Sequence, residues 1–177
     1  MEEKDVIKAL RHARHDWLNV IQLIKANVAL KRYDRIEGII EQATRQAFCE
    51  SRLSSLSVTK VEYYLLTYHW NQYPVQLEYE IVGEPFSLKH EEDRLFRLCQ
   101  SVLEKLNNTC TEDAEHNVLL SFVFNEGGCQ VTFDFQGVVQ MRVEEWEELM
   151  PLHLTVEDFH EKECLLSACF SKNEVRH

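Results

Sequence analysis

The sequence predicts an α+β protein in two parts, a long helical hairpin over residues 1–57 followed by a small α/β sandwich over residues 58–177. Three observations support this prediction. Residues 4–30 contain neither glycine nor proline, and their apolar side chains recur at helical spacing. Alternation typical of strands begins only at Val75. The first part holds ten Lys and Arg against eight Asp and Glu, whereas the second holds nine against twenty-two.

A heptad pattern defines the first helix, and a second helix follows over residues 34–56 after a turn at residues 31–33. Two helices cannot enclose a core, because each wide apolar face stays half exposed. We therefore expect two copies to pair as a four-helix bundle, with packing of the hairpin onto its own carboxy-terminal domain as the alternative. The a/d seam comprises Ile7, Leu10, Arg14, Trp17, Ile21, Ile24 and Val28, and the second helix should bury Ile36, Ile39, Ile40, Ala43, Ala47 and Leu53.

The second part mixes helices and strands. We expect helices on one face of a small, largely antiparallel sheet. Asn125-Glu126-Gly127-Gly128 is a strong hairpin signal, and acidic helical or irregular segments should precede the last strand. The expected order is a short helix containing residues 61–70, a strand at 75–81, a helix at 88–107, and strands at 117–124, 130–135 and 164–170.

Composition excludes several classes of protein. With 177 residues and a net charge of −11, the chain is too short for a large multidomain enzyme and too acidic to favour nucleic acid as a partner. We find no membrane span or signal peptide, and so expect a cytoplasmic protein that does not bind membranes. The six cysteines form no CxxC pair, which predicts reduced, mostly buried thiols. No metal site is expected, and His153 and His160 are interpreted as ordinary surface residues.

Common catalytic motifs are absent from the sequence: there is no GxxxxGK[ST], GxGxxG, GxSxG or HExxH. The run from Arg14 to Asn19 stands out instead, because His15 occupies a heptad b position opposite the apolar seam and should face solvent. An exposed imidazole is a competent nucleophile toward phosphorus. Asp16 could bias its tautomer, and Arg11 and Arg14 could offset phosphate charge. His12 is the rival nucleophile, but no acid follows it.

A nearly neutral, partly apolar strip continues from His15 along the same helix face, which is unusual for an outer surface. We interpret it as a docking strip for a partner protein. It consists of Asn19, Gln22, Leu23 and Ala26, with Asn27 beside them.

The His-Asp-x-x-Asn run resembles the phosphoacceptor helix of two-component sensor kinases, and the segment RHDWLNVIQLIKANVALKRYDRI with the domain order resembles the sporulation initiation phosphotransferase B family. This resemblance implies a dimeric four-helix bundle, phosphorylation of His15, and a carboxy-terminal domain descended from the kinase ATP-binding fold. It implies a phosphotransferase that accepts a phosphoryl group from the aspartyl phosphate of a single-domain response regulator. The group then passes to the receiver-domain aspartate of a sporulation transcription factor. The receiver would supply Mg²⁺, and this chain would bind no cofactor.

Two alternatives remain. A histidine kinase with residual ATP-dependent autophosphorylation would need a glycine-rich lid, yet no glycine follows Gly137. Asn107-Asn108 and the segment from Asp134 to Gly137 are at most relics of a nucleotide site, so we expect a degenerate domain that does not use ATP. The second alternative is a non-catalytic dimeric scaffold, in which His15 would have no chemical role.

Overall fold

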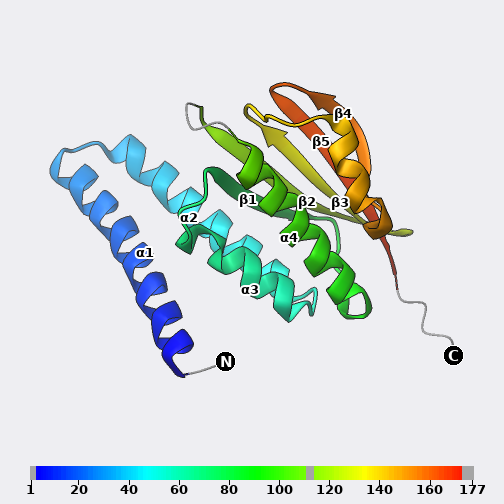
Figure 1. The fold of residues 1–177 in the computed structure, drawn as a ribbon. Helices are drawn as coiled ribbons and strands as arrows, with labels where there is room; N and C mark the ends of the chain where they lie inside the picture. The colour runs from blue at the N-terminus through cyan, green and yellow to red at the C-terminus, as the bar shows by residue number, and fades with distance from the viewer. Residues whose placement is uncertain (1–2, 111–113, 173–177) are drawn as a thin grey trace, which may run out of the picture. The chain divides into compact units, whose positions relative to one another are not determined.

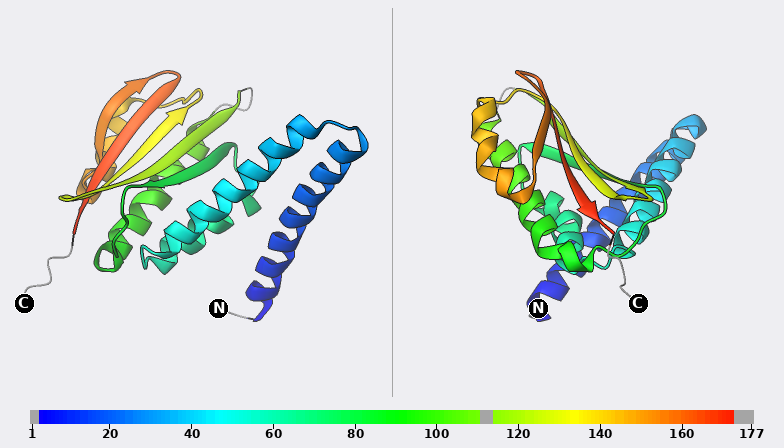
Figure 2. Two further views of the ribbon diagram at one scale, coloured as in Figure 1. Left: turned by 180° about the vertical axis from the view of Figure 1, so that it is seen from behind. Right: turned by 90° about the vertical axis from the view of Figure 1, so that its right-hand side faces the viewer.

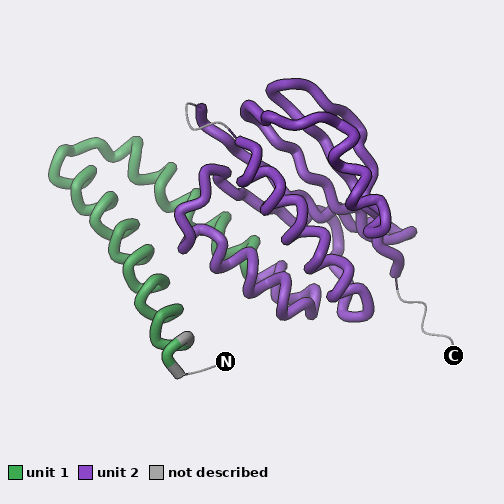
Figure 3. Tube along the Cα trace, viewed as in Figure 1, with its two compact units in different colours: residues 1–50 green, residues 51–177 purple. Residues whose placement is uncertain are grey.

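The computed structural model describes residues 3–110 and 114–172, and the chain divides into two compact units, residues 1–50 and 51–177 (Figure 3). The first unit is a helical hairpin, as predicted, of α1 (Glu3–Ala29) and most of α2 (Tyr33–Ser54). Lys31 ends α1 in the left-handed conformation with φ 55°, and the Arg32 amide donates to the Asn27 carbonyl at 2.9 Å. These two features form a Schellman-type cap. In the described part of the chain, no helix is both long and apolar enough to cross a bilayer.

The second unit contains a five-stranded sheet with the strand order β1-β2-β3-β5-β4. Its β2–β3 hairpin turns where the sequence predicted, and every pairing except the parallel β1–β2 pair is antiparallel. β4 was not predicted from the sequence, because it lies within a segment expected to be helical or irregular. The strands are β1 (Val75–Val82), β2 (His116–Asn125), β3 (Gly128–Gln136), β4 (Thr155–His160) and β5 (Glu163–Ser171).

Helices cover one face of this sheet, which confirms the predicted α+β class (Figures 1 and 2). Alternate residues of β2, β3 and β5 are buried, as expected for a sheet with one covered face. Phe122, Phe133 and Phe170 of these strands are buried in one core with Leu98 and Leu103 of α4. The helices are α3 (Thr59–Thr67), η1 (Tyr68–Trp70), η2 (Lys89–Glu91), α4 (Glu92–Thr109) and η3 (Val143–Leu152).

The end of α2 belongs to the second unit. Leu53 and the following Leu56 are fully buried in the core of that unit. The Leu88 amide donates to the Leu56 carbonyl at 2.8 Å, and the Arg52 guanidinium donates to the Gly83 carbonyl. The helix therefore continues from one compact unit into the other.

Gly137 is required by close packing against a buried histidine. Its φ is 152°, and a Cβ added there would lie 2.3 Å from Nδ1 of His116, whose side chain is 1% exposed. We expect Gly137→Ala to lower the free energy of unfolding by about 1–3 kcal/mol, because neither backbone nor imidazole has room to shift. Thermal denaturation should show a melting point several degrees lower.

The matched control for this prediction is Gly127→Ala in the β2–β3 turn. A Cβ at Gly127 would meet only Asn125 Oδ1, at 3.4 Å, and its φ is not positive. Equal melting points for both variants would contradict the packing argument.

Candidate functional site

His15 lies on the outer surface of α1, with 72% of its side chain exposed. Its Nδ1 atom is held by two neighbours: Asn19 Nδ2 lies 3.2 Å away, and Asp16 Oδ1 lies 3.5 Å away. The Asn19 contact spans one helical turn, since residues i and i+4 are neighbours on a helix surface. Within the described residues, we find no side chain bonded to Nε2 of His15. The imidazole is therefore anchored through one nitrogen and open to solvent at the other.

The tautomer of His15 decides whether it can act as a nucleophile. When Nδ1 carries the proton, it can donate toward Asp16, and Nε2 presents its lone pair. When Asn19 donates to Nδ1, the proton resides on Nε2 and the exposed nitrogen has no lone pair to offer. Asp16 favours the first, nucleophilic tautomer because its carboxylate only accepts, whereas the Asn19 amide favours the second because it donates to Nδ1.

The neighbouring cationic and histidine side chains differ in position. Arg11 and Arg14 are both exposed, but about 100° per residue places Arg11 beside His15 and turns Arg14 toward the apolar seam. His12 is half-buried and already has an interaction partner. Its access to another protein is therefore poorer than that of His15.

The predicted docking strip lies on the exposed surface of α1, except at its end. Asn19, Gln22, Leu23 and Ala26 are exposed, and Leu23 keeps 54% of its surface accessible. Asn27 is half-buried, and its amide donates to the Leu23 carbonyl at 2.8 Å. That bond holds Asn27 within its own helix, so four of the five residues form an open surface next to His15.

The apolar seam of α1 is uncovered in the single chain. Its most exposed members are Leu10 at 64%, Trp17 at 58% and Ile21 at 55%. A second line of residues is half-buried, namely Ala9, Val20 and Asn27, and Ile24 at the near edge of the seam is half-buried as well. Helix geometry places the two lines about 100° apart and His15 roughly 130° from each. The helix thus has two sides suited to helix contacts and a third, free side that carries His15.

The residues proposed as relics of a nucleotide site either hold the fold together or face away from the helices. Asn107 donates to the Tyr68 hydroxyl at 2.7 Å and to the Leu103 carbonyl at 2.8 Å, and accepts from the Val75 amide at 3.1 Å. Its amide therefore links α4, η1 and β1. Asp134 is exposed on β3, between the buried Phe133 and Phe135, and so lies on the sheet face opposite α4. Gly137 has the packing role described above.

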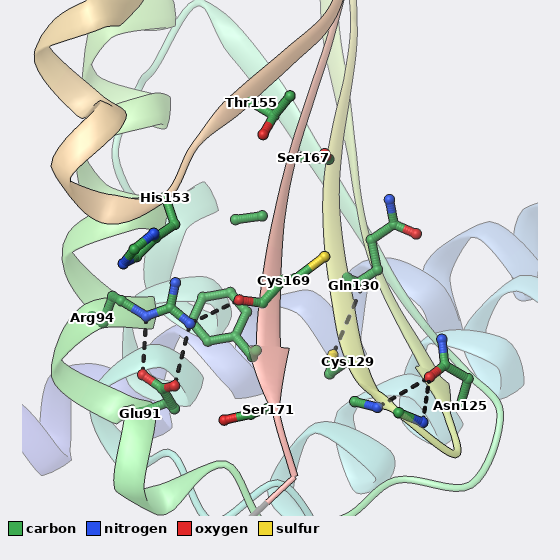
Figure 4. A pocket seen from close by; sticks show the side chains of 14 residues that line it. Glu91, Arg94, Asn125, Cys129, Gln130, His153, Thr155, Ser167, Cys169 and Ser171 are labelled. Atoms are coloured by element: carbon green, nitrogen blue, oxygen red, sulfur yellow. Dashed lines mark hydrogen bonds and ion pairs between the residues drawn. The ribbon is translucent and has the colours of Figure 1, made fainter.

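A cavity of about 700 Å³ is lined by residues of η2, the start of α4, the β2–β3 turn, β4 and β5, with His153 directly after η3 (Figure 4). The Arg94 guanidinium occupies it, pairing with the Glu91 carboxylate at 2.9 Å, donating to the Leu152 and Cys169 carbonyls, and stacking 3.9 Å over the Phe170 ring. Only 17% of the Arg94 side chain is exposed. Its guanidinium is engaged in holding these elements together.

The cysteines are all free thiols, as expected. Burial raises the pKa of Cys99, Cys129 and Cys164 to about 12 in each case. These three thiols are consequently protonated at neutral pH and are poor nucleophiles. Cys169 is exposed, whereas Cys49 and Cys110 are partly covered.

Comparison with known families assigns both parts of the chain. Residues 1–56 match the model described as the sensor kinase SpoOB-type alpha-helical domain, and residues 57–171 match that of sporulation initiation phosphotransferase B, C-terminal. The class is therefore a two-component-type protein with a helical domain and an α+β domain. More specifically, the chain belongs to the sporulation initiation phosphotransferase B family, which confirms the resemblance seen in the sequence. Sporulation initiation phosphotransferase B of Bacillus subtilis (strain 168) is 32% identical over 135 residues, spanning 75% of this chain and 70% of that protein.

Solved structures with similar folds are more distant. The histidine kinase AdeS of Acinetobacter baumannii has 12% identity and a TM-score of 0.45, covering 90% of this chain and 98% of that one. The histidine kinase ThkA, crystallised with the response regulator TrrA, has 12% identity and a TM-score of 0.44, covering 96% and 63%. A bacterial phosphotransferase at 1.7 Å has 9% identity and a TM-score of 0.42, covering 94% and 97%.

Proposed function

We propose that this chain is a phosphorelay intermediate that carries a phosphoryl group on His15. The group would come from the aspartyl phosphate of a single-domain response regulator and pass to the receiver-domain aspartate of a sporulation transcription factor. The observation that carries the proposal is the exposed imidazole of His15, whose Nε2 faces solvent beside Asp16, in a chain of this family.

The transfer needs little from the protein beyond positioning. The Nε2 lone pair attacks phosphorus, the P–O bond to the aspartyl group breaks, and the aspartate leaves as a carboxylate. The new N–P bond leaves a positive imidazolium whose Nδ1 proton faces Asp16. Arg11 adds positive charge near the phosphoryl oxygens. Return transfer reverses these steps, and the receiver supplies the Mg²⁺ that stabilises charge in the loose transition state.

The working unit of the proposal is a homodimer. Large apolar side chains remain exposed on both helices of the hairpin, Trp17 and Ile21 on α1 and Tyr33, Ile40 and Phe48 on α2. Large apolar side chains left exposed on both helices indicate an interface. Two hairpins packed through these sides would form a four-helix bundle and leave His15 on the outside.

A reconstituted transfer assay tests the function. The full chain is incubated with Mg²⁺ and a receiver domain carrying labelled aspartyl phosphate. A parallel reaction contains labelled ATP and no receiver. Label that reaches the chain only from the receiver, and that is acid-labile and base-stable, supports a histidine phosphotransferase. Label from ATP alone would identify a kinase, and label in neither reaction would leave the scaffold alternative.

The docking strip can be tested by placing a charge on it. Leu23→Glu should weaken receiver binding by roughly tenfold or more, since it adds a carboxylate to an apolar contact without touching the bundle interior. Single-turnover transfer measured against receiver concentration should show a higher half-saturation concentration with an unchanged dimer. The matched control is Lys89→Glu, an exposed change of larger charge in the second unit, away from both the docking strip and the apolar seam in sequence. Unchanged transfer by Leu23→Glu would remove Leu23 from the docking surface.

A further inference from the structure

The β4–β5 hairpin gathers three side chains with metal-ligating atoms. One ligand atom from each of Asp158, His160 and Glu163 lies within 4.8 Å of the other two. His160 and Glu163 are direct partners in the antiparallel register, so their side chains point to the same face. Asp158 precedes His160 by two residues and shares that face. Phe159 and Cys164 form the next pair along the two strands, and their side chains point to the opposite face.

A bulge in β4 supports this arrangement. The register shifts between Val156 and Asp158, and the half-buried Val156 and Phe159 both pack against the core. Because the bulge absorbs one extra residue, the strand can bury these two side chains and still present Asp158 and His160 outward. The Phe159 amide donates to Asp158 Oδ1 at 2.8 Å. The packing of Val156 and Phe159 holds the hairpin from the core side, beneath the cluster.

The distances fit a small divalent ion. Zn²⁺ bonds of about 2.0–2.2 Å at tetrahedral angles separate neighbouring ligand atoms by about 3.3–3.6 Å. His160 Nε2 lies 3.2 Å from Asp158 Oδ1, which is close to that separation. The Glu163 ligand atom lies within 4.8 Å of both others, and rotation of its exposed side chain can bring it closer to complete the set.

Charge also favours a cation here. Residues 155–167 contain Glu157, Asp158, Glu161 and Glu163 against the single Lys162. Two carboxylates held this close repel each other unless a positive group lies between them. One imidazole with two carboxylates suits Zn²⁺ and its transition-metal neighbours, whereas Mg²⁺ and Ca²⁺ prefer oxygen ligands alone.

We propose that Asp158, His160 and Glu163 bind a divalent transition metal of the Zn²⁺ type, with water completing its coordination, and that the ion ties β4 to β5 at the sheet edge. The sequence analysis expected no metal site and took His160 for an ordinary surface residue. The missed signal is an Asp-x-His pair followed by a two-residue turn and a glutamate. The proposal concerns only the second unit and does not depend on phosphoryl transfer.

The test is calorimetric titration of the chelator-treated full chain with ZnCl₂, in a His15→Gln background that removes one exposed competing imidazole. We expect one ion per hairpin, a melting point raised by Zn²⁺, and affinity at least about tenfold lower in His160→Ala. Glu161→Gln is the matched control: it removes an acid from the adjacent turn and should retain nearly full affinity.

Several results would overturn the proposal. The first is equal Zn²⁺ affinity in His160→Ala and its parent. The second is an affinity loss in Glu161→Gln as large as that in His160→Ala. The third is the absence of both binding heat and a change in melting point at millimolar ZnCl₂. Substitution by Co²⁺ gives an independent reading, because a thiolate charge-transfer band would assign the ion to a cysteine such as Cys169 instead. His160 is 64% exposed, so its replacement should leave the fold intact, which circular dichroism verifies.

Discussion

His15→Gln is expected to abolish phosphoryl acceptance, lowering transfer from a labelled receiver by at least roughly a thousandfold. Glutamine keeps a polar side chain of similar length but has no nitrogen lone pair that can attack phosphorus. Since His15 is exposed and its contacts are confined to one helix turn, the variant should fold and pair like its parent. The measurement is acid-labile label on the chain, with circular dichroism and sedimentation as checks on fold and mass.

The matched control for this prediction is His12→Gln, one turn earlier in the same helix. It makes the same chemical change at a half-buried position and should retain transfer. Full labelling of His15→Gln combined with loss in His12→Gln would move the phosphorylation site to His12. Loss in both variants would require comparing their dimer content before assigning the nucleophile.

Ile21→Asp is expected to raise the dimer dissociation constant by at least about a hundredfold. Ile21 is 55% exposed in the single chain and lies in the middle of the apolar seam. Each apolar side chain of this size contributes about 1.5–3 kcal/mol when buried, and a symmetric dimer loses two of them. Burying the two new carboxylates adds a further cost. Sedimentation velocity over a concentration series should therefore show a folded monomer.

Gln22→Asp controls for added charge at the neighbouring position. Helix geometry turns Gln22 about 100° from Ile21, toward His15, so this variant should remain dimeric. A dimeric Ile21→Asp would argue against the seam as the interface, whereas a monomeric parent chain would favour packing of the hairpin onto the carboxy-terminal domain.

Most of the fold could be predicted from local patterns. The 27-residue α1 was visible because its apolar side chains recur at helical spacing without a glycine or proline, and the β2–β3 hairpin because its turn contains Gly127-Gly128. β4 was missed for a physical reason. Its bulge breaks the alternation of apolar and polar residues, and its acidic side chains have low strand propensity. Pairing with β5 holds it in the sheet despite that composition.

The candidate site was predicted in part. The exposure of His15 and its nearness to Asp16 and Asn19 follow from helix geometry alone, because all three lie within about one turn. The half-burial of Asn27 and His12 does not follow, since it depends on what packs beside α1. The roles of these residues in transfer remain predictions for the assays above.

The sequence by itself determined the helical hairpin, the one-sided sheet and the outward position of His15, since each follows from the spacing of residues a few positions apart. Tertiary structure alone decided the position of β4 and the hydrogen bonds by which the Asn107 side chain links α4, η1 and β1. It also decided that Asp158, His160 and Glu163 lie close together. Strand pairing and core packing join residues that are distant along the chain or lack a periodic pattern. Their energies depend on partners that no local window of sequence contains.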